Sequence, residues 1–245
     1  MSNLQDKVVL ITGSSKGIGA DMARQFGAAG AKVVVNYASS AQGAEEVVAH
    51  IKSQGGVAIA VKADVSVEAE VTRLFDAAIA EYGRIDVLVN NAGVMQTKLL
   101  KDNSEADFDR HFDINVKGTF FALKEAALRL ADNGTIINFS SSTAKLMLPS
   151  YAVYSASKAA VDQLTRVFSK EVGRGISVNS VAPGPTGTDL FLNGKSDEVI
   201  AKLASMNAFN RLGSPEDITK VVLFLASEDA KWISGQVIPV NGAMV

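Results

Sequence analysis

The sequence predicts an α/β fold in which a parallel sheet of about seven strands carries helices on both faces. Short apolar runs rich in β-branched residues, such as 7–12 (KVVLIT), are typical of strands buried on both faces of a sheet. Most of these runs are followed by a stretch of helical pattern, and the first is joined to its helix by a glycine-rich turn. With right-handed crossovers, this alternation gives a doubly wound sheet, and we expect one domain over residues 1–245.

The predicted elements follow one another with few gaps. We expect strands at 7–12, 32–36, 57–61, 85–89, 135–139, 176–181 and 237–240. We expect helices at 20–29, 42–54, 66–82, from 104 through the neighbourhood of Asn115, at 149–173 and at 214–227. The segment 186–213 is less regular, and a loop of this length in a compact domain is usually functional, so we expect a substrate lid there.

Composition excludes several classes of function. The net charge is −2, and the sequence has no basic stripe of the kind that binds nucleic acid. There is no cysteine, and the two histidines, His50 and His111, are too few and too separated to predict a metal site. The polar start (1–7) lacks a signal-peptide pattern, and no apolar run is long enough to span a membrane. The sequence therefore predicts a cytoplasmic protein.

Tyr154 and Lys158 form the first candidate site. Four residues apart in a helix, they project from one face, so the ammonium can act on the phenol. A cation ~4 Å away favours the phenolate by about 1 kcal/mol in water-like surroundings and about 4 kcal/mol at an effective dielectric of ~20. We therefore expect a proton donor whose pKa is lowered toward neutrality.

The glycine-rich turn at 13–19 forms the second candidate site. It lies between a strand and a helix, the context in which glycines let the backbone approach a pyrophosphate at a helix N-terminus. Its sequence is Gly13-Ser14-Ser15-Lys16-Gly17-Ile18-Gly19.

With these residues the chain resembles the short-chain dehydrogenase/reductase family, over nearly its whole length. The motifs T-G-x-x-x-G-x-G, N-N-A-G, a helix asparagine, a serine thirteen residues before the tyrosine, Y-x-x-x-K and P-G-x-x-x-T occur in the family order. They lie at Thr12 to Gly19, Asn90 to Gly93, Asn115, Ser141, Tyr154 to Lys158 and Pro183 to Thr188. The resemblance implies a Rossmann fold and an oxidoreductase that acts on the CH–OH group of donors.

The resemblance also implies catalytic roles. Tyr154 is the general acid/base, and Lys158 lowers its pKa and binds the nicotinamide ribose. Ser141 holds the carbonyl oxygen, with Ser140 and Ser142 as less favoured candidates. Asn115 anchors a water that links Lys158 to solvent.

NADPH is the expected cofactor. An acidic residue after the second strand would repel a 2′-phosphate, but Asn36 occupies that place, and Lys16 supplies a positive charge. The expected cofactor-binding residues are Gly13, Ser14, Ser15, Lys16, Gly17, Ile18, Gly19, Asn36, Tyr37, Ala38, Ser39, Asp64, Val65, Asn91, Ala92, Gly93, Tyr154, Lys158, Pro183, Gly184, Thr186 and Thr188. Pro185 and Thr186 depart from the family pattern, which leaves the contact of Thr186 open, and Asn241 replaces a frequent aspartate.

The expected substrate is a neutral, apolar or aromatic ketone or aldehyde that is reduced to an alcohol. The residues expected to contact it are mostly apolar and include no arginine; they are Met95, Ser141, Thr143, Met147, Tyr151 and Phe191, with Val94, Gln96, Leu146 and Leu190 nearby. Three alternatives remain: a 3-oxoacyl-carrier-protein reductase, an NAD-dependent polyol or sugar-alcohol dehydrogenase, and a non-catalytic NADP sensor.

The family resemblance implies a homotetramer or homodimer built on the helices that hold Asn115 and Tyr154. Apolar residues on these helices exceed what one sheet face needs. They are Phe120, Phe121, Leu123, Val161, Leu164 and Phe168.

Overall fold

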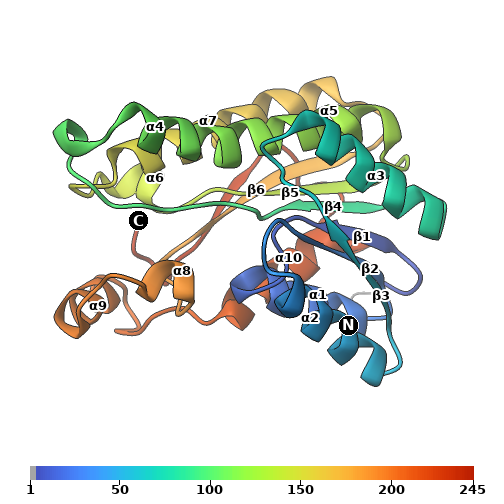
Figure 1. Cartoon of the computed structure of the whole chain (residues 1–245), viewed down its shortest axis with the longest axis horizontal. Coiled ribbons are helices and arrows are strands. Elements are labelled where there is room, and N and C mark those ends of the chain that lie inside the picture. The colour runs from blue at the N-terminus through green and yellow to red at the C-terminus, as the bar shows by residue number, and fades with distance from the viewer. Residues whose placement is uncertain (1–3) are drawn as a thin grey trace.

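The computed structural model describes residues 4–245, so the first three residues of the polar start lie outside the described part of the chain. Its centre is a sheet of seven parallel strands in the order β3-β2-β1-β4-β5-β6-β7 (Figure 1). The strands are β1 (Val8–Ile11), β2 (Lys32–Tyr37), β3 (Val57–Lys62), β4 (Val87–Asn90), β5 (Thr135–Phe139), β6 (Ser177–Pro183) and β7 (Val237–Val240). The Rossmann fold expected from the sequence is confirmed.

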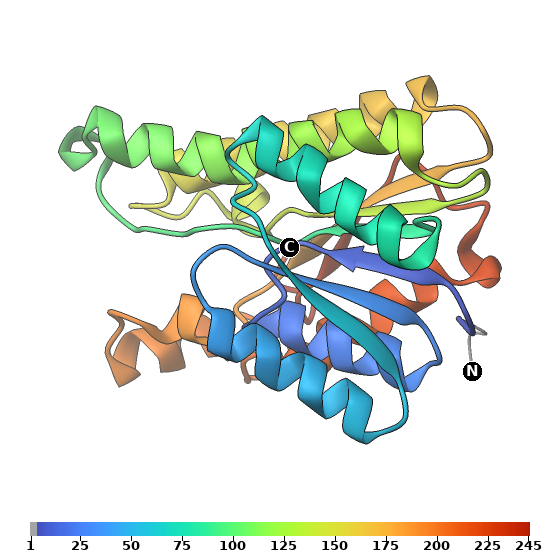
Figure 2. The same cartoon turned by 45° about the vertical axis from the view of Figure 1, so that its right-hand side comes forward.

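Helices cover both faces of the sheet (Figures 1 and 2). On one face lie α1 (Gly17–Ala28), α2 (Ala41–Ser53) and α10 (Pro215–Ala226); on the other lie α3 (Glu68–Tyr82), α4 (Glu105–His111), α5 (Gly118–Arg129) and α7 (Ala152–Glu171). Three short helices, α6 (Thr143–Leu146), α8 (Asp189–Leu192) and α9 (Asp197–Ala204), lie near the carboxyl ends of the strands. Two 3₁₀ turns, Leu100–Asp102 and Glu228–Ala230, and a π-helical segment, Phe112–Lys117, complete the described elements.

The two apolar cores follow from the alternation of side chains along each strand. In β1, Val9 and Ile11 pack on the side of α1, whereas Leu10 packs on the side of α3 and α5. Because both faces are covered, β1 is apolar at all four positions and β4 at its first three, rather than at every second one.

The strand order places a ligand-binding crevice between β1 and β4. The chain winds outward from β1 to β3 and then returns to β4, so the segments after β1 and β4 diverge from the carboxyl edge of the sheet. The Thr12 hydroxyl accepts hydrogen bonds from the N–H groups of Asn91 and Ala92, both at 3.0 Å. The glycine turn and the Asn-Asn-Ala-Gly segment are thus held side by side.

Local differences from the predicted elements have physical causes. The predicted helix start at Ser66 is wrong, because the Ser66 N–H and hydroxyl bond the Asp64 carboxylate and the helix begins two residues later. The predicted capping boxes at Ser104 and Ser214 are present.

Candidate active site

Tyr154 and Lys158 lie one turn apart on the buried face of α7. This helix begins at Ala152 rather than at the predicted Pro149, because the preceding residues form a turn in which Ser150 has a φ of 70°. The Lys158 Nζ donates a hydrogen bond to the Phe139 carbonyl at 2.7 Å and lies 6.0 Å from the centroid of the Tyr154 ring. The end of β5 therefore fixes the ammonium beside the phenol.

Burial controls the protonation of this pair. Desolvation raises the pKa of Tyr154 to about 12, while a hydrogen bond with Ser141 opposes the rise. Desolvation lowers the pKa of Lys158 to about 8, against the effect of the Asp162 charge. The direction of the Tyr154 pKa shift is opposite to the predicted lowering, because burial removes water from the phenol and disfavours the charged phenolate. The phenol is therefore protonated at neutral pH.

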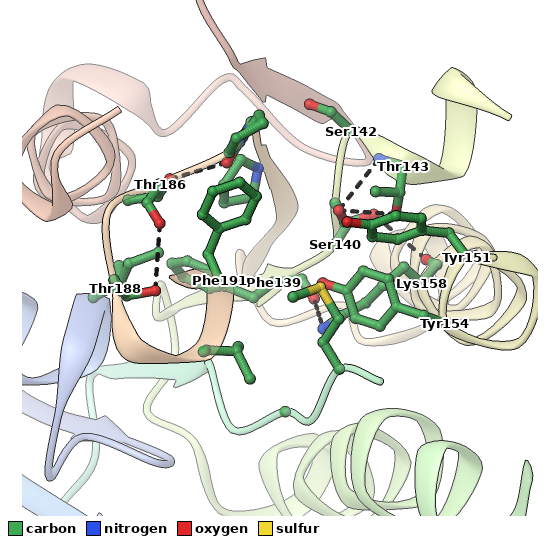
Figure 3. Close-up of a pocket in the computed structure, with 18 of the residues that line it drawn as sticks. Phe139, Ser140, Ser142, Thr143, Tyr151, Tyr154, Lys158, Thr186, Thr188 and Phe191 are labelled. Atoms are coloured by element: carbon green, nitrogen blue, oxygen red, sulfur yellow. Dashed lines mark hydrogen bonds between the residues drawn. The ribbon is translucent and has the colours of Figure 1, made fainter. Parts of the chain in front are cut away.

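The three adjacent serines have different partners (Figure 3). Ser140 Oγ donates to the Lys158 carbonyl at 3.4 Å, and Ser142 Oγ donates to the Ala182 carbonyl at 3.2 Å. Ser141 Oγ accepts hydrogen bonds from the N–H and the hydroxyl of Thr143, at 3.2 and 3.0 Å. Both hydrogen bonds use lone pairs of the Ser141 oxygen, so its own O–H group can still donate a hydrogen bond to Tyr154. This geometry agrees with the choice of Ser141 from spacing.

Asn115 lies in a π-helical segment, Phe112–Lys117, between α4 and α5. Its side-chain amide accepts from the Val94 N–H at 2.8 Å and donates to the Val94 carbonyl and to Ser157 Oγ, both at 3.0 Å. Asn115 therefore joins the segment after β4 to α7, close to Lys158. The predicted long helix is interrupted here, and π-helical turns are frequent at functional sites.

The glycine turn forms a cradle that leaves no room for a side chain at Gly13 or Gly19. A Cβ on Gly19 would lie 2.5 Å from the Gly13 carbonyl oxygen, and a Cβ on Gly13 would lie 2.8 Å from the Ala92 Cα. Gly13 and Gly17 have φ values of 62° and 57°, which favour glycine. The N-terminus of α1 points into this cradle, so the residues present fit the diphosphate of a dinucleotide.

A long cleft runs from this cradle across the ends of β2, β3 and β4. It is lined by most of the predicted cofactor-binding residues: Gly13, Ser15, Lys16, Gly17, Ile18, Gly19, Asn36, Tyr37, Ala38, Ser39, Asp64, Val65, Asn91, Ala92, Gly93 and Thr188. Ser14 is not among them, because its hydroxyl is buried and donates to the Ile11 carbonyl. Sequence reasoning missed Ser40, Arg110 and Asp189, which also line the cleft.

Asn36 links the glycine turn to the chain that follows β3. Its Oδ1 accepts from the Gly13 N–H at 3.0 Å, and its Nδ2 donates to the Ala63 carbonyl at 3.0 Å. Its amide is thus used within the protein. Lys16, in contrast, is exposed at the cleft and makes no ion pair within residues 4–245.

A second, mostly apolar pocket adjoins the cleft and contains Tyr154, Lys158 and Ser141 (Figure 3). The predicted residues Met95, Thr143, Tyr151, Phe191, Pro183, Gly184 and Thr186 line it. Met147 does not: its φ of 50° turns it outward, and its side chain is 88% exposed. Its neighbours Leu146 and Leu148 line the pocket instead, together with Leu190 and Leu203.

The segment that contains α8 and α9 covers one side of this pocket (Figure 3). The Gly187 N–H donates to the Gly213 carbonyl, and the Gly213 N–H donates to the Pro185 carbonyl, both at 2.9 Å. The two ends of the segment therefore lie side by side. Sequence reasoning left it irregular because its two helices are short.

Sequence reasoning missed Asp162, which is buried one turn beyond Lys158; the regular spacing of Tyr154, Lys158 and Asp162 could have revealed it. Thr143 was predicted to contact the substrate, and its hydrogen bonds to Ser141 are an additional role that the sequence did not reveal. Residues 4–245 contain no cluster of His, Cys, Asp and Glu side chains suited to a metal ion.

Comparison with known proteins assigns this arrangement to a family. A family model described as Enoyl-(Acyl carrier protein) reductase matches residues 13–244. A short-chain dehydrogenase/reductase of Aspergillus novofumigatus is 46% identical over 252 residues, with 98% of this chain and 96% of the relative covered. The chain belongs to the short-chain dehydrogenase/reductase family. It is therefore an oxidoreductase.

Other members of the short-chain dehydrogenase/reductase family are similarly close. A probable tetrahydroxynaphthalene reductase of Zymoseptoria tritici is 45% identical, with 99% of this chain and 96% of the relative covered. The solved structure of the angucycline C-6 ketoreductase LanV with bound NADP superposes with a TM-score of 0.94 at 40% identity, covering 99% of this chain and 97% of that chain. Among the described helices, none has both the length and the apolar character needed to cross a bilayer.

Proposed function

We propose that this short-chain dehydrogenase/reductase is an NADPH-dependent reductase of neutral apolar or aromatic ketones and aldehydes. The observation that carries the proposal is the convergence of a protonated tyrosine, a serine hydroxyl and a lysine in an apolar pocket that adjoins a dinucleotide cradle. The cofactor is NADP(H), as in the LanV structure. When bound, NADPH supplies the hydride.

The side chains divide the remaining chemistry. Tyr154 donates its proton to the carbonyl oxygen as that oxygen gains negative charge. Ser141, whose lone pairs are engaged by Thr143, donates a hydrogen bond to the same oxygen and stabilises the charge. Lys158 has two N–H groups left after its bond to Phe139, and these would hold the nicotinamide ribose. A tyrosine pKa of about 12 suits the direction of carbonyl reduction.

Lys16 supports the preference for NADPH over NADH. Lys16 is exposed and lines the same cleft as Ser39 and Ser40, and no acidic side chain directly follows β2. A 2′-phosphate would gain a charge-assisted hydrogen bond there. Asn36, which occupies the place of a discriminating acid, is uncharged and bonded to the glycine turn.

The test is initial-rate oxidation of NADPH and of NADH with 1-tetralone, a quinone, an α-ketoester, an acetoacetyl thioester and a sugar. We expect the highest kcat/KM with NADPH and the aryl ketone or quinone. A thioester favoured by orders of magnitude would instead support 3-oxoacyl reduction, and activity with NADH alone would refute NADPH dependence. Absence of turnover with every carbonyl would favour a non-catalytic role. Lys16→Ala should raise the KM for NADPH about 10-fold and change that for NADH little.

We also propose that copies of the chain associate through α5 and α7. The predicted Leu123 and Val161 are buried within the subunit, but Phe120, Leu128 and Val167 remain exposed by 47%, 78% and 46%. Light scattering should give a mass two or four times the 25.7 kDa of one chain. A monomer at micromolar concentration would contradict this.

A further inference from the structure

The polar groups in the substrate pocket differ in whether the protein already satisfies them. Most are bonded internally. Thr143 donates to Ser141, Thr186 to the Gly184 carbonyl, Thr188 to the Thr186 carbonyl, Asn91 to the carbonyls of Thr12 and Gly13, and Lys158 to the Phe139 carbonyl. The three adjacent serines have the partners described above, and Tyr154 is assigned to the carbonyl oxygen that is reduced. Among the described hydroxyls that line the pocket, that of Tyr151 is left without a partner.

Tyr151 is well placed for contact with a substrate. It precedes the first residue of α7, lines the pocket and is 8% exposed. Its ring centroid lies 6.4 Å from that of Tyr154, with the ring planes at 62°. Figure 3 shows both tyrosines on one side of the pocket, facing the segment that carries Thr186, Thr188 and Phe191. A substrate presented to Tyr154 therefore passes beside Tyr151.

The chemistry of this hydroxyl selects its ligand. Burial raises the pKa of Tyr151, so the group is a neutral phenol and a hydrogen-bond donor. The hydroxyl has no partner within the described part of the chain, so an oxygen on a ligand in the pocket can accept its hydrogen bond. The surrounding walls are apolar side chains, including Leu146, Leu148 and Phe191, so the rest of the ligand must be apolar.

From this geometry we infer that Tyr151 determines specificity by donating a hydrogen bond to a second oxygen of the substrate. The preferred substrates are then aromatic or alicyclic ketones that carry a hydroxyl or another carbonyl group on the same ring system. One oxygen lies at Tyr154 and Ser141 and is reduced; the other lies at Tyr151 and fixes the orientation of the rings. This inference rests on the proposed carbonyl reduction.

The test compares 1-tetralone with its 5-, 6-, 7- and 8-hydroxy derivatives in the NADPH-dependent assay. The wild type should prefer at least one hydroxytetralone to the parent ketone, and Tyr151→Phe should reduce that preference about 3- to 10-fold. The matched control is Tyr82→Phe, which removes a buried, unpartnered phenolic hydroxyl at the end of α3, outside the pocket. This control should retain the wild-type preference.

Binding is measured in parallel, by calorimetric titration of the same compounds into the enzyme with NADP⁺. Weaker binding of the preferred hydroxytetralone to Tyr151→Phe, relative to the parent ketone, supports the inference whether or not turnover is observed. An equal preference in wild type and Tyr151→Phe overturns it and leaves the carbonyl reductase function intact. A wild type that shows no preference for any hydroxyl position overturns it as well. Failure to reduce any carbonyl refutes the proposed function, while the titration still decides the role of Tyr151.

Discussion

Replacing Lys158 by methionine should stabilise the protein at neutral pH and abolish reduction. Burial lowers the pKa of Lys158 from 10.5 to about 8, and a difference of about 2.5 pKa units corresponds to about 3 kcal/mol of unfolding free energy. Methionine has a similar length and no charge. Loss of the hydrogen bond from Nζ to the Phe139 carbonyl offsets about 1 kcal/mol of this gain in unfolding free energy. We therefore expect a net gain of about 2 kcal/mol at pH 7.

The pH dependence identifies the cause of this gain. Below pH 8 both the folded and the unfolded wild type bind the lysine proton, so the full cost of burying the charge is present. Between pH 8 and 10.5 only the unfolded chain keeps the proton, and the cost disappears as the pH rises. The advantage of Lys158→Met, about 2 kcal/mol at pH 7, should therefore fall to about zero by pH 10.

Urea unfolding followed by circular dichroism at pH 7, 8.5 and 10, at fixed protein concentration, measures the difference. Lys52→Met, on the exposed side of α2, controls for the removal of one lysine. A Lys158→Met variant that is less stable than the wild type at pH 7, or whose advantage is the same at all three pH values, would refute the reasoning. A variant that kept its reductase activity would refute the catalytic role of Lys158.

Three further substitutions test the site. Tyr154→Phe should lower kcat for reduction at least 100-fold, because the proton donor is lost, and should leave NADPH binding measured by fluorescence unchanged; full activity would exclude Tyr154 as the acid. Ser141→Ala should lower kcat by about 100-fold with a smaller effect on KM, which steady-state kinetics will separate. Gly19→Ala should weaken NADPH binding more than 10-fold while circular dichroism stays native, because the new Cβ lies 2.5 Å from the Gly13 carbonyl oxygen; unaltered affinity would show that the cradle adjusts.

Much of the fold could be predicted because it depends on local patterns. Apolar runs fixed the seven strands, and parallel pairing followed from the helices between them. The interruption near Asn115 could not be predicted, because a π-helical turn depends on contacts with Val94 and Ser157, which are distant in sequence. The short helices α8 and α9 were missed because four and eight residues give little periodicity.

In the candidate site, too, features that depend on local sequence patterns were predicted, and features that depend on the folded surroundings were not. Helical spacing placed Tyr154 and Lys158 on one face, and the family resemblance added Ser141; the three side chains line one pocket. Met147 points outward because its backbone is in the left-handed region, which the residue pattern did not predict. The direction of the tyrosine pKa depends on desolvation, a property of the folded surroundings.

The closed base of the segment between Gly187 and Gly213 makes that segment an exchangeable cassette. Its two ends are bonded to each other, and between them it is held to the rest of the protein by the hydrogen bond from the Ala208 N–H to the Gly242 carbonyl and by the ion pair of Arg211 with Asp217. Doubling the length of such a loop costs only about 0.6 kcal/mol in closure entropy. Variation in the length and sequence of this cassette would reshape the wall formed by Leu190, Phe191 and Leu203 and leave the catalytic groups in place. Evolution or engineering can thus change which ketone is accepted without rebuilding the machinery that reduces it.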